Sequence, residues 1–146
     1  MNEYIALVDN FKIPAERYRA MATISGARGA RESRGRRLSP DKIEALIWGL
    51  YHNNAAVRRC CLELLDQHPS TKAVPHIVAK FTDPVPRVRR HAVHAIRCDV
   101  CKAGNTILTP DLINRLREMA DTDPSPKVRA EAAYGLAEAE PSRAPP

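Results

Sequence analysis

Two histidines and two cysteines near the middle of the chain carry side chains that bind transition metals. They are His91, His94, Cys98 and Cys101. Because the first three are spaced at i, i+3 and i+7, they share one face if this segment is helical. The last two are separated by two residues, a spacing typical of zinc knuckles and of redox-active dithiols. The group therefore suits Zn²⁺ in a tetrahedral site, with a redox pair as the alternative.

A structural role for these four residues is favoured over both. The two histidines lie beside an apolar stripe, so we expect them to flank a core and to face solvent. Cysteine is also an ordinary small apolar residue in protein cores. The stripe consists of Val88, Ala92, Ala95 and Ile96.

Motifs typical of enzymes are missing from the sequence. It contains no glycine-rich phosphate loop, no Gly-x-Ser-x-Gly and no His-Glu-x-x-His, so we predict no catalysis. Aromatic residues make up only 5% of the chain, which predicts a core of Ala, Leu, Ile and Val packed between helices. Trp48, the only tryptophan, is expected to flank that core rather than to stack on a base.

Helix starts recur along the chain and would position the metal-binding residues. Ser39 and Thr109 are each followed by Pro-Asp, a combination in which the hydroxyl caps the helix and proline occupies its first turn. Apolar residues then recur at i, i+3, i+4 and i+7, as expected for one buried helix face. These residues are Ile43, Leu46, Ile47 and Leu50 in one copy, and Val74, Ile77, Val78 and Phe81 in the next.

A second motif follows each of these helices. The segment 83–89 reads Asp-Pro-Val-Pro-Arg-Val-Arg and matches 123–129, while 52–58 is a weaker copy with His52 in place of Asp. Asp83 and Asp123 are expected to cap the second helix of each pair, with proline just inside it. The unit is thus helix, turn, helix. It occurs at 39–66, 70–97 and 109–139, with an insertion at 98–108.

Stacking of these units is required because a single helix pair cannot bury its own apolar stripe. The sequence therefore predicts an all-α fold, a short right-handed α-solenoid of about three helix pairs. Residues 1–25 are expected to form an N-terminal helical cap, and 26–38 a basic flexible linker. The charged and proline-rich residues 140–146 are expected to form a disordered tail.

The pattern Asp-Pro-x-Pro-x-Val-Arg-x-x-Ala at 83–92 resembles a HEAT repeat, most closely the repeats named after phycobilisome lyases. The resemblance covers residues 39–139. It implies that the second helices line a concave binding surface and that the Asp and Arg of the motif link neighbouring repeats. The residues assigned to this structural role are Arg58, Asp83, Arg89, Asp123 and Arg129.

Positive charge is in excess, with 23 Lys and Arg against 17 Asp and Glu, a net charge of +6. Two groups of basic residues are candidates to contact a partner. One lies in the predicted linker, at Arg28, Arg31, Arg34, Arg36 and Arg37, and the other lies on the second helices, at Arg59, Arg87, Arg90 and Lys127. Such residues bind an acidic protein surface or the phosphate backbone of a nucleic acid.

The expected function is a non-catalytic protein–protein interaction scaffold. Nucleic-acid binding through the basic residues is the first alternative, and a zinc or redox site is the second. No apolar run approaches the ~18 residues that a membrane span needs, so no membrane association is expected. The first residues lack the basic start and apolar stretch of a signal peptide, so we expect a cytoplasmic protein.

Overall fold

The computed structural model describes residues 2–26, 35–98 and 108–139, and these residues form helices, turns and loops without a β-strand. The prediction of a short all-α solenoid is confirmed. The pairs are α1 (Tyr4–Asp9) with the 3₁₀ helix η1 (Asn10–Lys12) and α2 (Arg17–Ser25); α4 (Pro40–Gly49) and α5 (Ala55–Gln67); α6 (Val74–Ala79) with the 3₁₀ helix η2 (Lys80–Thr82) and α7 (Pro86–Arg97); and α8 (Pro110–Thr122) and α9 (Pro126–Ala139).

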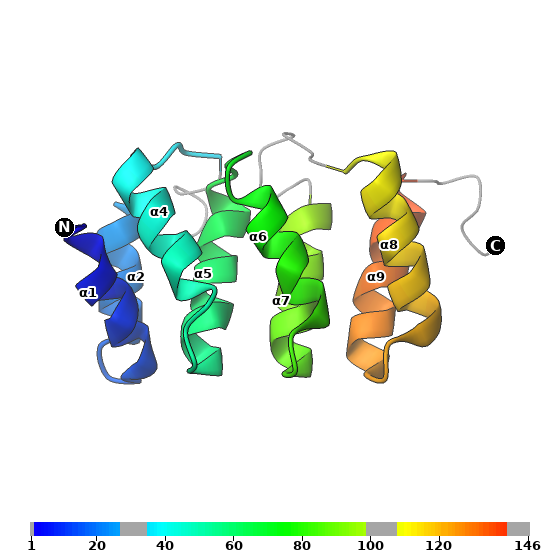
Figure 1. The fold of residues 1–146 in the computed structure, drawn as a ribbon, viewed down its shortest axis with the longest axis horizontal. Coiled ribbons are helices and arrows are strands. Elements are labelled where there is room, and N and C mark those ends of the chain that lie inside the picture. Colours follow the sequence, from blue (N-terminus) through cyan, green and yellow to red (C-terminus); the bar gives the residue numbers. More distant parts are fainter. Residues whose placement is uncertain (1, 27–34, 99–107, 140–146) are drawn as a thin grey trace.

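The helix pairs stack side by side in two layers (Figure 1). The first helices, α1, α4, α6 and α8, form the layer in front, and the second helices, α2, α5, α7 and α9, form the layer behind. One hydrophobic core runs between the layers from Val8 and Phe11 to Leu116 and Val128. None of the helices in the described residues is long and apolar enough to cross a membrane.

Side-chain caps fix where the helices begin. The hydroxyl of Ser39 accepts a hydrogen bond from the Lys42 amide and that of Thr109 accepts one from Leu112, as the sequence predicts. Asn54 caps α5, because its Oδ1 accepts hydrogen bonds from the amides of Ala56 and Val57. Amides in the first turn of a helix have no partner within the helix, and the side chain of Asn54 supplies one.

The expected caps at Asp83 and Asp123 are wrong in position. Helices α7 and α9 begin at Pro86 and Pro126, one proline later than predicted. The Asp83 carboxylate instead accepts the amide of Val85, and the Asp123 carboxylate accepts that of Ser125. Each aspartate therefore holds the turn before its helix, an arrangement in which an Asp side chain bonds an amide two residues on.

Gly49 lies where α4 packs tightly against its neighbours. A Cβ atom at this position would overlap the Cys61 sulfur and the Val8 side chain. Because glycine has no Cβ, α4 can lie directly against α1 and α5. The fully buried Leu46 and Leu50 flank this contact and fill the space around it.

The N-terminal helices share one contact with the later repeats, in which an arginine of the second helix binds a carbonyl. The guanidinium of Arg17 donates to the Phe11 carbonyl at 2.7 Å, six residues earlier in the chain. Arg58, Arg89 and Arg129 donate to carbonyls with the same six-residue separation. The buried Ala20 also stands three residues after its arginine, as Ala92 does after Arg89.

The end of the predicted linker is bound to the stack. His68 is fully buried at the end of α5 and contacts the Arg36 carbonyl through Nδ1 at 2.7 Å and the Ser25 hydroxyl through Nε2 at 3.1 Å. The Gly35 amide donates to the Gln67 carbonyl, and Gly35 has a φ of 75°, which favours glycine. Flexibility is therefore the wrong description for Gly35 and Arg36, whereas residues 27–34 lie outside the described part.

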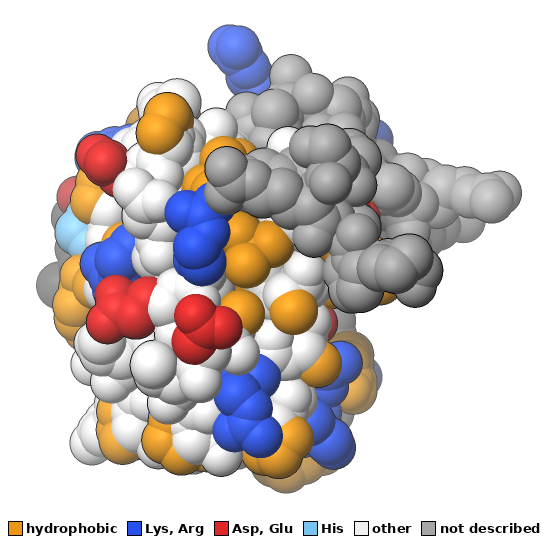
Figure 2. Space-filling model, turned by 90° about the vertical axis from the view of Figure 1, so that its right-hand side faces the viewer, with side chains coloured by type: hydrophobic (Ala, Val, Ile, Leu, Met, Phe, Trp, Pro, Cys, Tyr) orange, Lys and Arg blue, Asp and Glu red, His pale blue; other side chains and the backbone are white. Residues whose placement is uncertain are grey.

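Helices α8 and α9 form the C-terminal end of the stack. Hydrophobic side chains lie among basic and acidic ones on this face (Figure 2). Exposed residues of these two helices include Tyr134, Ala133 and Asp121. Terminal repeats require polar side chains on their outer surface because the next repeat does not cover it. The predicted tail at 140–146 lies outside the described residues.

Candidate functional site

A groove of about 370 Å³ lies on the layer of second helices. Side chains from three consecutive repeats line it, since α5, α7 and α9 all contribute. They are Leu62, Glu63, Asp66, Gln67, Arg90, His91, His94 and Glu131. The groove thus contains both histidines that the sequence singles out.

Charges of opposite sign alternate across the three helices. Helix α7 presents basic side chains, while α5 and α9 present acidic ones on either side of it. His94 lies between the two, with Nδ1 2.8 Å from the Glu131 carboxylate on α9 and Nε2 3.4 Å from the Asp66 carboxylate on α5. Arg97 donates to the same Glu131 carboxylate at 2.9 Å and to Glu138 at 3.1 Å. The second helices are therefore joined by ion pairs as well as by apolar packing.

These contacts shift the acid–base equilibria of the central pair. Hydrogen bonds to Asp66 and Glu131 raise the pKa of His94 to about 9, against the opposing effect of burial. Burial alone would raise the pKa of Glu131, but the hydrogen bond from His94 and the charge of Arg97 lower it to about 2. At neutral pH the His94 imidazolium is thus held between two carboxylates.

His91 makes a separate set of contacts one turn earlier on α7. Its Nε2 lies 3.3 Å from Glu63, and its Nδ1 lies 2.9 Å from the Arg87 carbonyl. Glu63 also accepts a hydrogen bond from Arg59 at 2.7 Å, and both partners contribute to the lowered pKa of Glu63 in spite of its burial. His91 therefore faces α5 rather than the cysteine that follows on its own helix.

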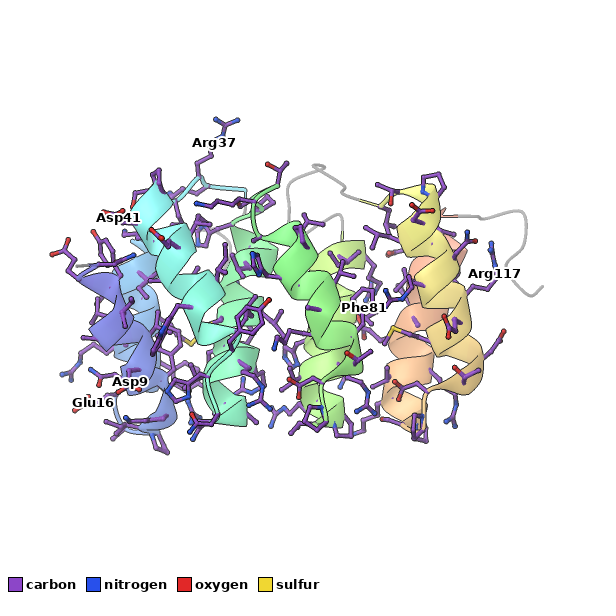
Figure 3. The ribbon with its side chains drawn as sticks, viewed as in Figure 1. Asp9, Glu16, Arg37, Asp41, Phe81 and Arg117 are labelled. Atoms are coloured by element: carbon purple, nitrogen blue, oxygen red, sulfur yellow. The ribbon has the colours of Figure 1, made fainter. Side chains whose placement is uncertain are left out.

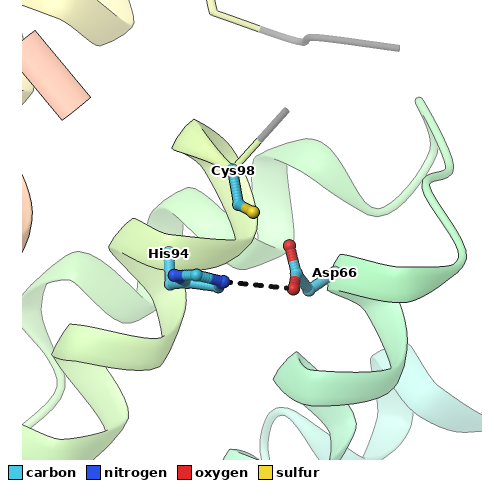
Figure 4. A group of neighbouring side chains, drawn as sticks. All are labelled: Asp66, His94 and Cys98. Carbon is cyan, nitrogen blue, oxygen red and sulfur yellow. Dashed lines mark ion pairs between the residues drawn. The ribbon is translucent and has the colours of Figure 1, made fainter. Parts of the chain in front are cut away.

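The predicted metal ligands are only partly brought together. Potential ligand atoms of Asp66, His94 and Cys98 all lie within 4.8 Å of one another (Figure 4). This group contains Asp66 from α5, whereas the predicted ligand His91 lies outside it. Cys101 lies outside the described residues, so neither the zinc knuckle nor the redox pair that includes it is described by the structure.

The remaining cysteines are buried in the core. Cys60 and Cys61 carry free thiols and are fully buried at the middle of α5. Burial raises the pKa of both thiols, most strongly that of Cys61. Since the thiolate is the reactive form, these two cysteines serve as apolar packing residues.

Arginine–aspartate pairs link each repeat to the next. Arg58 on α5 binds both oxygens of Asp83 at 2.8 and 3.1 Å, and its third nitrogen donates to the His52 and Asn53 carbonyls. Arg89 on α7 binds both oxygens of Asp123 at 2.9 and 3.0 Å in the same manner.

The two ends of the array depart from this pattern. Arg129 on α9 has only the carbonyl contact, to Asp123 at 2.7 Å. His52, which replaces Asp in the first copy, bonds Asp9 of the N-terminal pair at 2.8 Å. The histidine therefore keeps a link between repeats, although its chemistry differs from that of the arginine–aspartate pairs.

The model of HEAT repeats matches residues 43–137, which is more than half of the chain. The chain belongs to the HEAT repeat family. No curated protein and no solved structure shows significant similarity to it. The arginine–aspartate ion pairs between repeats and the two layers of helices agree with this membership.

The basic residues of this HEAT repeat protein do not form one continuous row. Arg59 and Arg90 occupy equivalent places on α5 and α7, but the equivalent place on α9 is Ala130. Arg59 is bound to Glu63, and Arg90 lies 3.5 Å from Glu131 with 47% of its side chain exposed. These contacts partly neutralise the basic residues that the sequence places on the second helices. Arg87 and Lys127, at the starts of α7 and α9, are exposed.

The basic residues of the linker are described only in part. Arg28, Arg31 and Arg34 lie outside the described residues. Arg36 donates to the Gly26 carbonyl at 3.1 Å. The exposed Arg37 points away from the top edge of the stack, above α4 and α5 (Figure 3).

A second groove of about 380 Å³ lies between η2 and α8. Phe81 and Met119 contribute apolar surface to it, and the Arg115 guanidinium lies over the Phe81 ring at 5.6 Å. The ion pair of Arg89 and Asp123 also lines this groove. The groove is therefore part of the junction between the last two repeats. Trp48 lies elsewhere, on α4, with 41% exposure and an edge contact to the His52 ring.

Proposed function

We propose that this HEAT repeat protein is a non-catalytic interaction scaffold that binds a protein segment in the groove across α5, α7 and α9. The observation that carries the proposal is the groove itself, which is lined by three consecutive repeats with side chains of both charges. HEAT repeats generally act as scaffolds for protein contacts, which supports the same conclusion. The motif favours a repeat of the phycobilisome-lyase type, and the buried free thiols of Cys60 and Cys61 suit a cytoplasmic location.

A partner with acidic groups fits one end of this groove best. Arg90 is half exposed in the groove, and Arg87 and Lys127 are exposed at the starts of α7 and α9. Carboxylates of a bound segment would reach these cations. Deeper in the groove, Glu63 and Asp66 favour basic or hydrogen-bond-donating groups on the same segment.

Nucleic acid is a poorer fit to the described surface. Phosphate binding depends on cations that follow the backbone, and acidic side chains beside them repel it. Here Glu63, Asp66 and Glu131 lie between the basic residues of the groove. A protein segment with charges of both signs is the complementary ligand.

Site-specific photo-crosslinking tests the proposal. A benzophenone amino acid replaces Arg90 in the groove or, as the control, the exposed Glu44 on α4 in the opposite layer. Irradiation of cells that produce each variant should give a discrete protein adduct from position 90 and none from position 44. Adducts from position 44 alone, or adducts with nucleic acid, would contradict the proposal.

A further inference from the structure

Three side chains of different chemistry converge beside the groove. Asp66 comes from the end of α5, His94 from the last turn of α7, and Cys98 directly follows α7 (Figure 4). Asp66 and Cys98 are 6% and 7% exposed and the His94 side chain is 35% exposed, so the place where the three meet is partly shielded from solvent. Their carboxylate oxygen, imidazole nitrogen and sulfur lie within 4.8 Å of one another.

We propose that Asp66, His94 and Cys98 form a mononuclear Zn²⁺ site. Thiolate, imidazole and carboxylate are the three ligand types that Zn²⁺ takes in proteins, and a site with three protein ligands leaves one position for water or a further ligand. A carboxylate and a thiolate together balance the charge of the ion. The thiol proton of Cys98 and the Nε2 proton of the His94 imidazolium are both released to the solvent when the metal binds.

The distances require only a small contraction. Ligand atoms around tetrahedral Zn²⁺ are about 3.5 Å apart, given metal–ligand bonds of about 2.0 to 2.3 Å. His94 Nε2 and the Asp66 oxygen are already 3.4 Å apart, and atoms that lie at most 4.8 Å from one another need to move by no more than about 1 Å to reach that geometry. Cys98 can supply part of this movement because it lies past the end of α7, with extended backbone dihedrals of −73° and 111°.

The orientation of His94 supports the site. Its Nδ1 faces Glu131 at 2.8 Å, and its Nε2 faces Asp66. Metal-binding histidines characteristically donate the N–H of the other ring nitrogen to a carboxylate, which fixes the ring and the tautomer. Glu131 occupies that position, and Arg97 holds the Glu131 carboxylate at 2.7 Å. The imidazole is thereby held with its second nitrogen toward the other two ligands.

The competing interpretation is an ion pair, in which His94 simply bridges two carboxylates. The two interpretations differ for Cys98, which takes no part in the ion pair but binds the metal. They also differ for His91, which is on the same helix and contacts Glu63 instead. His91→Gln is therefore a matched control for His94→Gln.

Cobalt substitution of the full chain tests the site. The protein is treated with chelator and kept reduced, then titrated with Co²⁺ and, in competition with a zinc indicator, with Zn²⁺. We expect one equivalent to bind, with a sulfur-to-cobalt charge-transfer band and the intense visible bands of a tetrahedral ion. His94→Gln should weaken Zn²⁺ binding at least 100-fold and Glu131→Gln about 10- to 100-fold, whereas His91→Gln should change it less than threefold.

Cys98→Ser decides the assignment of the sulfur. It should abolish the charge-transfer band, because Cys98 supplies the only sulfur among the three proposed ligands. Binding of less than about a tenth of an equivalent to the wild type would overturn the proposal, whatever the variants do. An unchanged band in Cys98→Ser, or an equal loss of affinity in His91→Gln and His94→Gln, would overturn it as well.

Discussion

The buried ion pair of Arg58 and Asp83 should contribute more to stability than any exposed ion pair of the protein. Their side chains are only 10% and 2% exposed, and the guanidinium binds both carboxylate oxygens and two carbonyls. Arg58→Met removes all of these bonds and leaves the Asp83 charge buried. Removal of one partner of a buried ion pair costs about 3–5 kcal/mol. Asp83 keeps its bond from the Val85 amide, so we expect a loss near the lower limit, about 3 kcal/mol.

Urea denaturation followed by circular dichroism measures this loss. It corresponds to a fall of about 10 °C in melting temperature for a chain of this size. Arg59→Met is the matched control, because the adjacent arginine makes a single i, i+4 ion pair with Glu63, and the two side chains are 12% and 31% exposed. That pair is expected to be worth under about 1 kcal/mol. A double-mutant cycle with Asp83→Asn isolates the interaction between the two side chains. The reasoning is refuted if Arg58→Met destabilises the protein no more than Arg59→Met.

Three other predictions concern the packing, the pH dependence and the N-terminal pair. Gly49→Ala should lower the free energy of unfolding by about 1–3 kcal/mol through overpacking, while the exposed Glu44→Ala should change it little, as urea titrations will report. Burial lowers the pKa of His68 below its unfolded value near 6.5. The buried neutral ring therefore stabilises the fold above pH 6.5, and this contribution to the free energy of unfolding is lost as the pH falls below 6.5. Unfolding titrations at pH 7.5 and 5 should therefore show a smaller advantage of the wild type over His68→Gln at pH 5; an equal advantage at both pH values contradicts the assignment. Arg17→Ala removes the bond to the Phe11 carbonyl and should raise amide exchange in α1 and α2 more than in α8 and α9; uniform exchange across the chain would argue against it.

Local signals in the sequence account for most of the fold. The Ser39 and Thr109 caps and the apolar stripes act within one or two turns, so their effect can be predicted without knowledge of the packing. The sequence does not reveal the arginine contact of the N-terminal helices, because Phe11 and Glu16 stand where the motif has Asp and Val. Its remaining signal is Arg17 followed three residues later by a buried Ala20, which is weak in isolation.

The composition of the candidate site depends on contacts between α5, α7 and α9, and these contacts cannot be predicted from local sequence patterns. The shared face of His94 and Cys98 follows from helical spacing alone. The candidate metal site contains Asp66 and not His91, because α5 and α7 are packed so that Glu63 lies opposite His91 and Asp66 lies opposite His94. Arg59 pairs with Glu63 one turn later on its own helix, and Arg90 on α7 lies near Glu131 on α9, so ion pairs partly neutralise the basic residues of the second helices.

The affinity of the crosslinked partner for two charge-reversal variants tests the binding groove most directly. Arg90→Glu changes the groove, and Glu44→Arg changes the opposite layer by an equal amount of charge. Titration calorimetry with the purified partner should give a Kd at least tenfold weaker for Arg90→Glu and within twofold of the wild type for Glu44→Arg. Equal affinities for both variants, or a loss confined to Glu44→Arg, would contradict binding across α5, α7 and α9.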